Sequence, residues 1–256
     1  MTPTAASETE TVSERLRVHR SRIRDVVTAH PSLFAPTMLL RPRHREYACR
    51  RNTDLVVEGF PRSGNTYLTA IIELYNPRVR LAHHLHASAQ FYRASRIGVP
   101  AVLLVRPPED AIASLLHRQD RRSGPAAPLR RYIAFHRSLL PIISNICIVP
   151  FDDLIRQPDR ALQRIASFSR IPLAPYPGDA DAELLVFQEI DRRDVLDNGG
   201  HLNERTVARP SPWREERTTA LRQRVEGAEP ALLKEASQIF SLLCEIARSQ
   251  TGSTDR

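Results

Sequence analysis

The feature that most constrains this fold is an apolar run that ends in a glycine-containing turn. Residues 54–60 read DLVVEGF, and the next six, PRSGNT, are mostly turn-forming types. Such a run is typical of a strand buried in a parallel sheet, and residues 66–75 then have a helical pattern. A strand, a tight turn and a helix start aim backbone N–H groups at one point. This unit is therefore suited to binding phosphate, although an ordinary strand–helix turn is the alternative.

The rest of the chain alternates between apolar runs and helical patterns. Further strands are predicted at residues 79–83, 100–105 and 145–151, and helices at residues 87–97, 109–118, 127–141, 158–170, 181–190 and 216–249. Strands that alternate with helices indicate an α/β fold in which helices cover both faces of a parallel sheet. We expect residues 1–52 to form an N-terminal helical arm and connector, and residues 53–256 to form the main domain.

Composition limits the classes of function. The 256 residues suffice for one α/β domain with a sizeable core, and no apolar run approaches the roughly 20 residues that span a bilayer. The N-terminus has no apolar signal-peptide core, so we expect a cytoplasmic protein. Three widely spaced cysteines indicate reduced thiols. The net charge of +8 makes an anionic ligand plausible, but the basic residues are scattered and match no nucleic-acid-binding motif.

The turn nearly matches the nucleotide-binding P-loop pattern, G-x-x-x-x-G-K-[ST]. Gly59, Gly64 and Thr66 fit it, but Asn65 stands where lysine is expected and Arg62 lies inside the loop. In P-loop NTPases that lysine reaches the β- and γ-phosphates. Because Asn65 cannot supply this charge, the loop is poorly suited to kinase or ATPase chemistry and is still suited to one phosphate.

The octapeptide FPRSGNTY resembles the 5′-phosphosulfate-binding loop of the PAPS-dependent sulfotransferases, Y/F-P-[KR]-S-G-[TNS]-T-[WY]. This resemblance implies a P-loop-like sulfotransferase architecture, 3′-phosphoadenosine 5′-phosphosulfate (PAPS) as donor, and no metal. It implies that Arg62 also helps the leaving phosphate depart. The residues that it implies for the donor's 5′-phosphate are Arg62, Ser63, Gly64, Asn65 and Thr66.

A second motif follows the predicted strand at residues 100–105. The segment VLLVRPPEDAIAS places Arg106 and Ser114 eight residues apart, with a helix start between them. Arginine can bind phosphate through two parallel hydrogen bonds, although arginine after a strand is also common as surface charge. The sulfotransferase 3′-phosphate motif, R-x-P-x-D-x-x-x-S, has this spacing, and Pro108 and Asp110 match it. The resemblance therefore implies that Arg106 and Ser114 hold the donor's 3′-phosphate.

The segment LAHHLHAS offers three histidines, His83, His84 and His86, as candidates for a general base. A metal site is one alternative, but the segment has no carboxylate or cysteine; a surface histidine cluster is another. The resemblance favours His84. The family's catalytic histidine precedes the 3′-phosphate arginine by about 22 residues, which is also the separation of His84 and Arg106. His86 is the second choice.

Two later segments resemble the family less closely. In VPFDDLIRQPDRALQRIASF, Phe151 replaces a tyrosine that lies near the adenine, so the resemblance implies an adenine contact for Phe151. In ARPSPWREE, Trp213 and Arg214 fit the loop that closes over the donor, but the glycines and the R-K-G triplet of that loop are missing. Arg209 or Arg205 is the expected substitute as a phosphate contact.

Taken together, the resemblance implies transfer of a sulfuryl group from PAPS to an acceptor hydroxyl or amine, with release of adenosine 3′,5′-bisphosphate. The expected acceptor is a small molecule or a glycan, with no nucleic-acid partner, no membrane span and no metal. One alternative is a phosphotransferase with an unusual P-loop, which would need a Mg²⁺ carboxylate and a replacement lysine. The other is a non-catalytic nucleotide-binding module that holds a partner through the N-terminal arm.

Overall fold

The computed structural model describes residues 46–118, 124–210 and 212–251. The predicted helix of the N-terminal arm lies outside these ranges. The described end of the connector packs on the main domain: Cys49 is fully buried in its core, and the Cys49 backbone N–H donates to Gln90 Oε1 at 2.8 Å. No helix of the described ranges has the length and apolar character needed to cross a membrane.

The centre of the domain is a four-stranded parallel sheet with strand order β2-β1-β3-β4. Its strands are β1 (Leu55–Gly59), β2 (Leu81–His83), β3 (Ala101–Val105) and β4 (Ile146–Pro150). The predicted α/β fold with a parallel sheet is confirmed. Both β1 and β3 are buried along their whole length, which explains why they read as continuous apolar runs. Because the strands are parallel, the turns after β1, β2 and β3 meet at one edge of the sheet.

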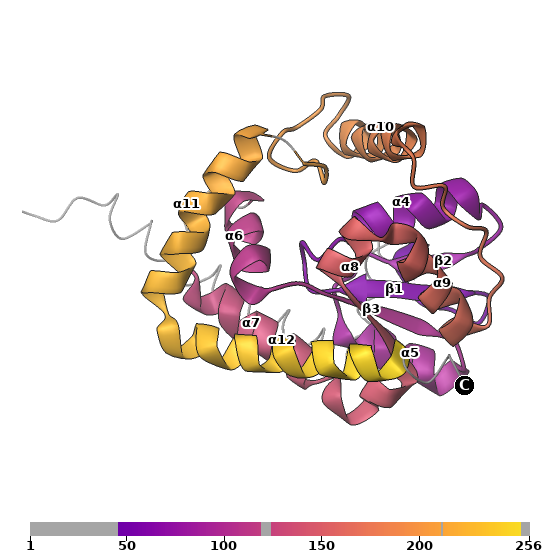
Figure 1. Cartoon of the computed structure of the whole chain (residues 1–256), viewed down its shortest axis with the longest axis horizontal. Coiled ribbons are helices and arrows are strands. Elements are labelled where there is room, and N and C mark those ends of the chain that lie inside the picture. Colours follow the sequence, from indigo (N-terminus) through magenta and orange to yellow (C-terminus); the bar gives the residue numbers. More distant parts are fainter. Residues whose placement is uncertain (1–45, 119–123, 211, 252–256) are drawn as a thin grey trace, which may run out of the picture.

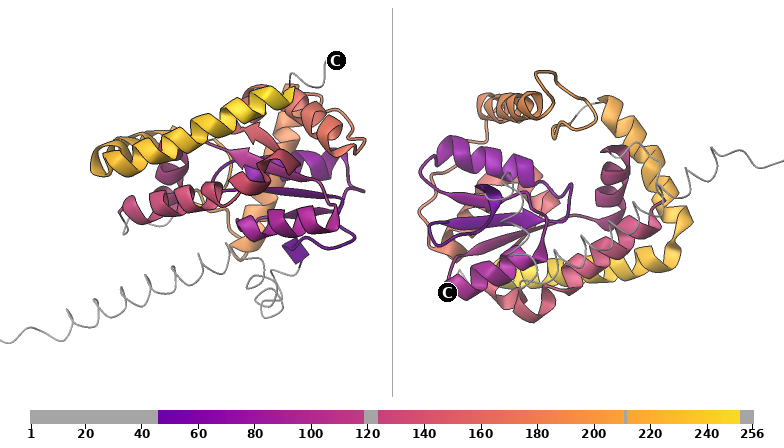
Figure 2. Two further views of the ribbon diagram at one scale, coloured as in Figure 1. Left: turned by 90° about the horizontal axis from the view of Figure 1, so that it is seen from below. Right: turned by 180° about the vertical axis from the view of Figure 1, so that it is seen from behind.

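Helices cover both faces of this sheet (Figure 1). Those on one face are α5 (Ser88–Ile97), α6 (Pro108–Arg118), α7 (Ala126–Arg137), α11 (Pro212–Ala228) and α12 (Pro230–Thr251). Those on the other are α4 (Asn65–Tyr75), α8 (Phe151–Arg156), α9 (Pro158–Ser169) and α10 (Ala180–Asp197). A 3-10 helix, Leu140–Asn145, precedes β4 and packs against the core on the first face. Along β1 the side chains alternate between the two cores, Val56 in the first and Leu55 and Val57 in the second. Helices α6 and α11 pack side by side, as the view from behind in Figure 2 also shows.

Several predicted elements differ from the structure. The helix predicted at residues 127–141 ends at Arg137, and the one predicted at residues 181–190 extends to Asp197. The single helix predicted at residues 216–249 is two helices, α11 and α12, which separate at Pro230. Proline lacks the N–H that a helix interior needs and is favoured in the first turn, so it begins α12. The strand predicted through Phe151 ends one residue earlier, and Phe151 begins α8 instead.

Candidate active site

The turn after β1 is held in a tight conformation by its backbone. Gly64 caps α4 with a left-handed φ of 97°, and Arg62 is also left-handed, with a φ of 74°. A Cβ on Gly64 would lie 3.1 Å from the Phe151 ring, and one on Gly59 would lie 2.6 Å from the Leu104 carbonyl oxygen. Both glycines of the motif are thus needed, because the backbone passes too close to Leu104 and Phe151 for a side chain at either position. Left-handed backbone at a non-glycine residue such as Arg62 is costly and is often found at functional sites.

Replacing Gly64 with alanine is expected to destabilise the fold by more than the roughly 1–2 kcal/mol of a left-handed alanine, because the new methyl group would also press on Phe151. Gly98 is a matched control, since its φ is 74° and a Cβ there would have no neighbour within 4 Å. Urea denaturation of the two alanine variants measures the difference. Equal destabilisation would show that contact with Phe151 does not constrain the loop.

The polar side chains of the turn point in different directions. Ser63 is fully buried, and its hydroxyl oxygen has no hydrogen-bond partner among the described residues. The amide of Asn65 is directed back toward the sheet, with Nδ2 3.5 Å from Glu58 Oε2, so Asn65 offers an anion only its backbone N–H. Thr66 turns toward β2, where its hydroxyl lies 3.0 Å from His84 Nε2.

Arg62 lies between the two residues predicted to bind the 3′-phosphate. Its Nε donates to Ser114 Oγ at 2.9 Å, and its carbonyl accepts from Arg106 Nη1 at 2.9 Å. Figure 1 shows the elements that meet here, the ends of β1 and β3 and the start of α6. The structure therefore brings Arg62, Arg106 and Ser114 into one network, although they are up to 52 residues apart in the sequence.

Arg106 is oriented by aromatic and carboxylate neighbours. Its guanidinium lies 4.2 Å from the centre of the Phe151 ring, and its carbonyl accepts a 2.7 Å bond from the Tyr132 hydroxyl. Burial lowers the pKa of Arg106, against the opposite effect of Asp110 and Asp152, yet an arginine keeps its charge in proteins. Its Nε is buried without a partner among the described residues, so a charged donor remains available.

The segment between α10 and α11 approaches the same site. The carbonyl of Thr206 accepts from Arg62 Nη1 at 3.4 Å, and the next residue, Val207, is buried in the core. Asp194 of α10 anchors the segment by accepting from the Asn203 N–H at 2.8 Å and from the Thr206 hydroxyl at 2.5 Å. The segment thus meets Arg62 through a backbone carbonyl, which is a hydrogen-bond acceptor.

The structure does not bring Arg209 to the other candidate residues by any described contact. Its Nε donates to Asp191 of α10 at 2.7 Å, and its Nη2 donates to Glu204 at 3.3 Å. These two carboxylates hold the side chain that was expected to contact phosphate. The side chains of Trp213 and Arg214 lie outside the described part of the chain.

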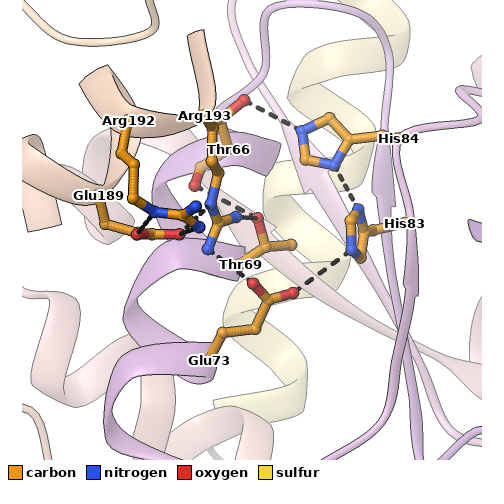
Figure 3. Close-up of polar contacts among 8 residues, drawn as sticks. All are labelled: Thr66, Thr69, Glu73, His83, His84, Glu189, Arg192 and Arg193. Carbon is orange, nitrogen blue, oxygen red and sulfur yellow. Dashed lines mark hydrogen bonds and ion pairs between the residues drawn. The ribbon is translucent and has the colours of Figure 1, made fainter. Parts of the chain in front are cut away.

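The histidine segment lies beside the turn. Strand β2 ends at His83, and both His84 and His86 have left-handed backbone, with φ of 60° and 49°. The ring of His84 joins Thr66 on one side and His83 on the other, Nδ1 to Nδ1 at 2.5 Å (Figure 3). The Nδ1 of His86 bonds the Gly59 carbonyl at 2.8 Å. The structure therefore places His84 in direct contact with the turn through a side chain, and His86 through the backbone.

The surroundings of both histidines favour the neutral imidazole. Burial lowers the pKa of His84 well below its ordinary value, and the nearby His83, His86 and Arg193 lower it further. Burial likewise lowers the pKa of His86 to about 4, although the bond to the Gly59 carbonyl opposes this. A neutral imidazole carries a lone pair, so either ring is chemically able to accept a proton.

Glu58 is a site residue that the sequence reasoning missed. It is fully buried in β1 and accepts from the backbone N–H groups of Leu85 at 2.8 Å and His86 at 3.0 Å, and from Gln90 at 3.4 Å. Burial raises the pKa of Glu58 to about 7, and these hydrogen bonds oppose the rise. The signal in the sequence was a lone carboxylate inside the apolar run LVVEG. Its effect is to hold the histidine segment against the turn.

Comparison with known proteins finds a distant resemblance in structure. No protein-family model matches the chain, and no curated protein matches it. A solved structure of the mouse sulfotransferase SULT7A1 complexed with PAP resembles it with a TM-score of 0.46 and 15% sequence identity, over 81% of this chain and 92% of that chain. A likeness this low does not establish a function. Among the described residues, no group of three or more His, Cys, Asp and Glu side chains is placed to hold a metal ion.

Proposed function

We propose that this chain is a sulfotransferase that moves a sulfuryl group from PAPS to an acceptor hydroxyl or amine. The observation that carries the proposal is the meeting of three segments at one sheet edge: the turn after β1, the Arg106–Ser114 motif and the segment with His84. The proposal is supported by Ser63 Oγ and Arg106 Nε, which are the donors within this site among the buried polar atoms that lack a partner in the described residues. Two such donors fit a ligand with two separate phosphate groups.

We assign the binding of the donor to these residues as follows. The backbone N–H groups of residues 63–66 and the Ser63 hydroxyl would hold the 5′-phosphate at the start of α4, where the helix dipole favours negative charge. Of these groups, the Ser63 N–H also donates to the Phe60 carbonyl at 3.2 Å. Arg106 and Ser114 would hold the 3′-phosphate. The Ser114 oxygen accepts from Arg62, so its hydroxyl hydrogen remains available for a phosphate oxygen. Phe151, which lies under Arg106, would keep that guanidinium in place and contact the adenine.

The donor supplies the sulfuryl group, whose bond to a phosphate oxygen breaks as its bond to the acceptor atom forms. His84 would take the acceptor's proton on Nε2, in place of the hydrogen bond that this atom makes with Thr66. Arg62 would stabilise the negative charge left on the phosphate oxygen, which departs as part of adenosine 3′,5′-bisphosphate. Positioning and fixed positive charge carry most of the rate gain, and no metal is needed.

Thermal unfolding with adenosine 3′,5′-bisphosphate, compared with ADP and with ATP plus Mg²⁺, tests this proposal. The bisphosphate at about 100 times its dissociation constant is expected to stabilise the fold by roughly 2.7 kcal/mol. We expect Arg106→Ala to abolish this shift. Arg80→Ala is the matched control and should keep it, because Arg80 is exposed and paired with Asp54.

Three outcomes separate the alternatives. A shift with the bisphosphate that depends on Arg106 supports the donor site and leaves the acceptor to be found with a panel of small molecules and glycans. A shift only with ATP and Mg²⁺ would overturn the proposal in favour of a phosphotransferase. No shift with any of the three nucleotides would also overturn it, and would favour a non-catalytic module.

A further inference from the structure

A continuous row of polar contacts leads from the turn to a carboxylate on α4 (Figure 3). The Thr66 hydroxyl meets His84 Nε2 at 3.0 Å, and His84 Nδ1 meets His83 Nδ1 at 2.5 Å. On its other side, His83 Nε2 lies 3.4 Å from Glu73 Oε1. The row therefore joins the candidate base to Glu73, a residue to which the proposed reaction assigns no role.

Glu73 reaches His83 because of the period of α4. Thr66, Thr69 and Glu73 are three and four residues apart and so share one face of the helix, the face toward the end of β2 and toward α10. Arg193 of α10 secures the far side of the carboxylate, with Nη2 2.6 Å from Glu73 Oε2 and Nη1 3.3 Å from the Thr69 hydroxyl. A second carboxylate, Glu189, holds the same arginine at 2.7 Å.

Glu73 is an acceptor only. Partial burial raises its pKa, but the bond from His83 and the charge of Arg193 outweigh this effect, so the pKa lies below its ordinary value. An ionised carboxylate has no hydrogen to donate. The neighbouring nitrogen, His83 Nε2, must therefore carry the hydrogen between them.

The hydrogen on His83 Nε2 determines which of the other three ring nitrogens of His83 and His84 carry a hydrogen. We take His83 as neutral: with its one hydrogen on Nε2, its Nδ1 then carries a lone pair. Because two facing nitrogens can share only one hydrogen, His84 Nδ1 must be the donor of the 2.5 Å bond. Neutral His84 then has its lone pair on Nε2, and the Thr66 hydroxyl donates to it. Which nitrogen of a histidine is protonated is thus set by what its other nitrogen contacts.

We propose that Glu73, acting through His83, holds His84 in the tautomer that carries its hydrogen on Nδ1 and keeps Nε2 as the proton acceptor. The inference rests on the proposed function, in which His84 is the base. Glu73 and His83 are positioning residues, since they act on the acceptor only through His84. After His84 has taken a proton it is a cation, and the negative charge of Glu73 stabilises that cation across His83.

The environment of His84 contains no second carboxylate among its described neighbours that could take this role. The His84 ring contacts Tyr47 of the connector, Thr66 of α4, and His83 and His86 of its own segment, and the charges of Arg193 on α10 and Arg118 on α6 also act on it. None of them carries a carboxylate. Cations favour a neutral His84, but only an acceptor at Nδ1 decides which nitrogen bears the hydrogen.

The test is ¹⁵N NMR of the histidine rings in the full chain at pH 7.5, with the His84 signal assigned by its loss in His84→Gln. We expect His84 to be protonated at Nδ1 and not at Nε2. Glu73→Gln is expected to give a mixture of tautomers and to lower kcat about tenfold or more with KM unchanged. Glu189→Gln removes a carboxylate from the same arginine without touching a histidine, so it should change neither.

Substitution of His83 gives a second, independent readout. His83→Leu is expected to remove the bias toward the Nδ1 tautomer, and His83→Asn to restore it in part, because the asparagine oxygen can accept near the position of Nδ1. A wild-type His84 protonated at Nε2, as a cationic His83 would impose, overturns the proposal. So does an unchanged tautomer in Glu73→Gln or His83→Leu.

The outcome is separable from the proposed function, since the tautomer is measured without donor or acceptor. Binding of adenosine 3′,5′-bisphosphate, followed on the same variants by thermal unfolding, should be retained in Glu73→Gln, because Glu73 contacts none of the proposed phosphate ligands. If the wild-type chain fails to bind the bisphosphate, the sulfotransferase proposal fails while the NMR result still decides whether Glu73 orients His84.

Discussion

Replacing His84 with alanine is expected to lower turnover with PAPS by at least about a hundredfold, the usual contribution of a general base. The loss should appear in kcat, because the deprotonated Nε2 is needed in the transition state. The measurement is product formation over a panel of hydroxyl and amine acceptors. His86→Ala is the matched control, since His86 lies two residues away and bonds the Gly59 carbonyl. A larger loss in His86→Ala would move the base to His86, and near-normal turnover in His84→Ala would remove His84 from the role.

The same base predicts the acid limb of the pH profile. A histidine must be unprotonated to accept the acceptor's proton, and burial together with His83, His86 and Arg193 lowers the pKa of His84 well below 6.5. As pH falls through 6.5, His84 therefore stays neutral, and kcat/KM is expected to hold level and to decline only at clearly lower pH. A decline centred near pH 7 would contradict a base in this environment.

Replacing Arg62 with alanine is expected to cause a loss of similar size, at least about a hundredfold, because it removes fixed positive charge beside the departing phosphate oxygen. The structure adds a second cause. The Arg62 side chain links Ser114 to the Thr206 carbonyl, so its removal also frees the segment before α11. Single-turnover rates at saturating donor separate the chemical step from donor binding.

Arg62→Lys is the control for this prediction. Lysine keeps the positive charge. Like arginine, it has a Cβ, so the strain of the left-handed backbone at a φ of 74° is unchanged. We expect the lysine variant to retain most of the rate and the alanine variant to lose it. Equal losses would indicate that the links to Ser114 and Thr206 matter more than the charge, since only arginine offers donors in the geometry of a fork.

Much of the fold could be predicted from local pattern. The strands buried on both faces read as apolar runs at residues 55–59 and 101–105, and the turn residues between β1 and α4 were recognisable because glycine is needed where backbone passes close to neighbours. The helix boundary at Pro230 was missed, although proline is a local signal. Motif spacing and the family resemblance also predicted the turn, Arg106 with Ser114, and the histidine segment as candidate site residues, and hydrogen bonds link the turn to each of the other two.

The contacts that define the site depend on residues far apart in the sequence. Arg209 was expected at the phosphate site and is paired with Asp191 and Glu204. Glu58 and Glu73 belong to a strand and a helix that otherwise read as core elements, and nothing local marks them as partners of histidines. Their roles arise only where the ends of parallel strands bring separate turns together.

By itself, the sequence determined which segments become strands and helices and where the candidate phosphate-binding turn lies, because the spacing of apolar residues and the choice of turn residues act over a few positions. Only the tertiary structure decided which side chains share hydrogens. A hydrogen bond requires two atoms within about 3 Å. For Arg62 with Ser114, and for Glu73 with Arg193, that distance is reached across 52 and 120 residues of chain, once the sheet has formed.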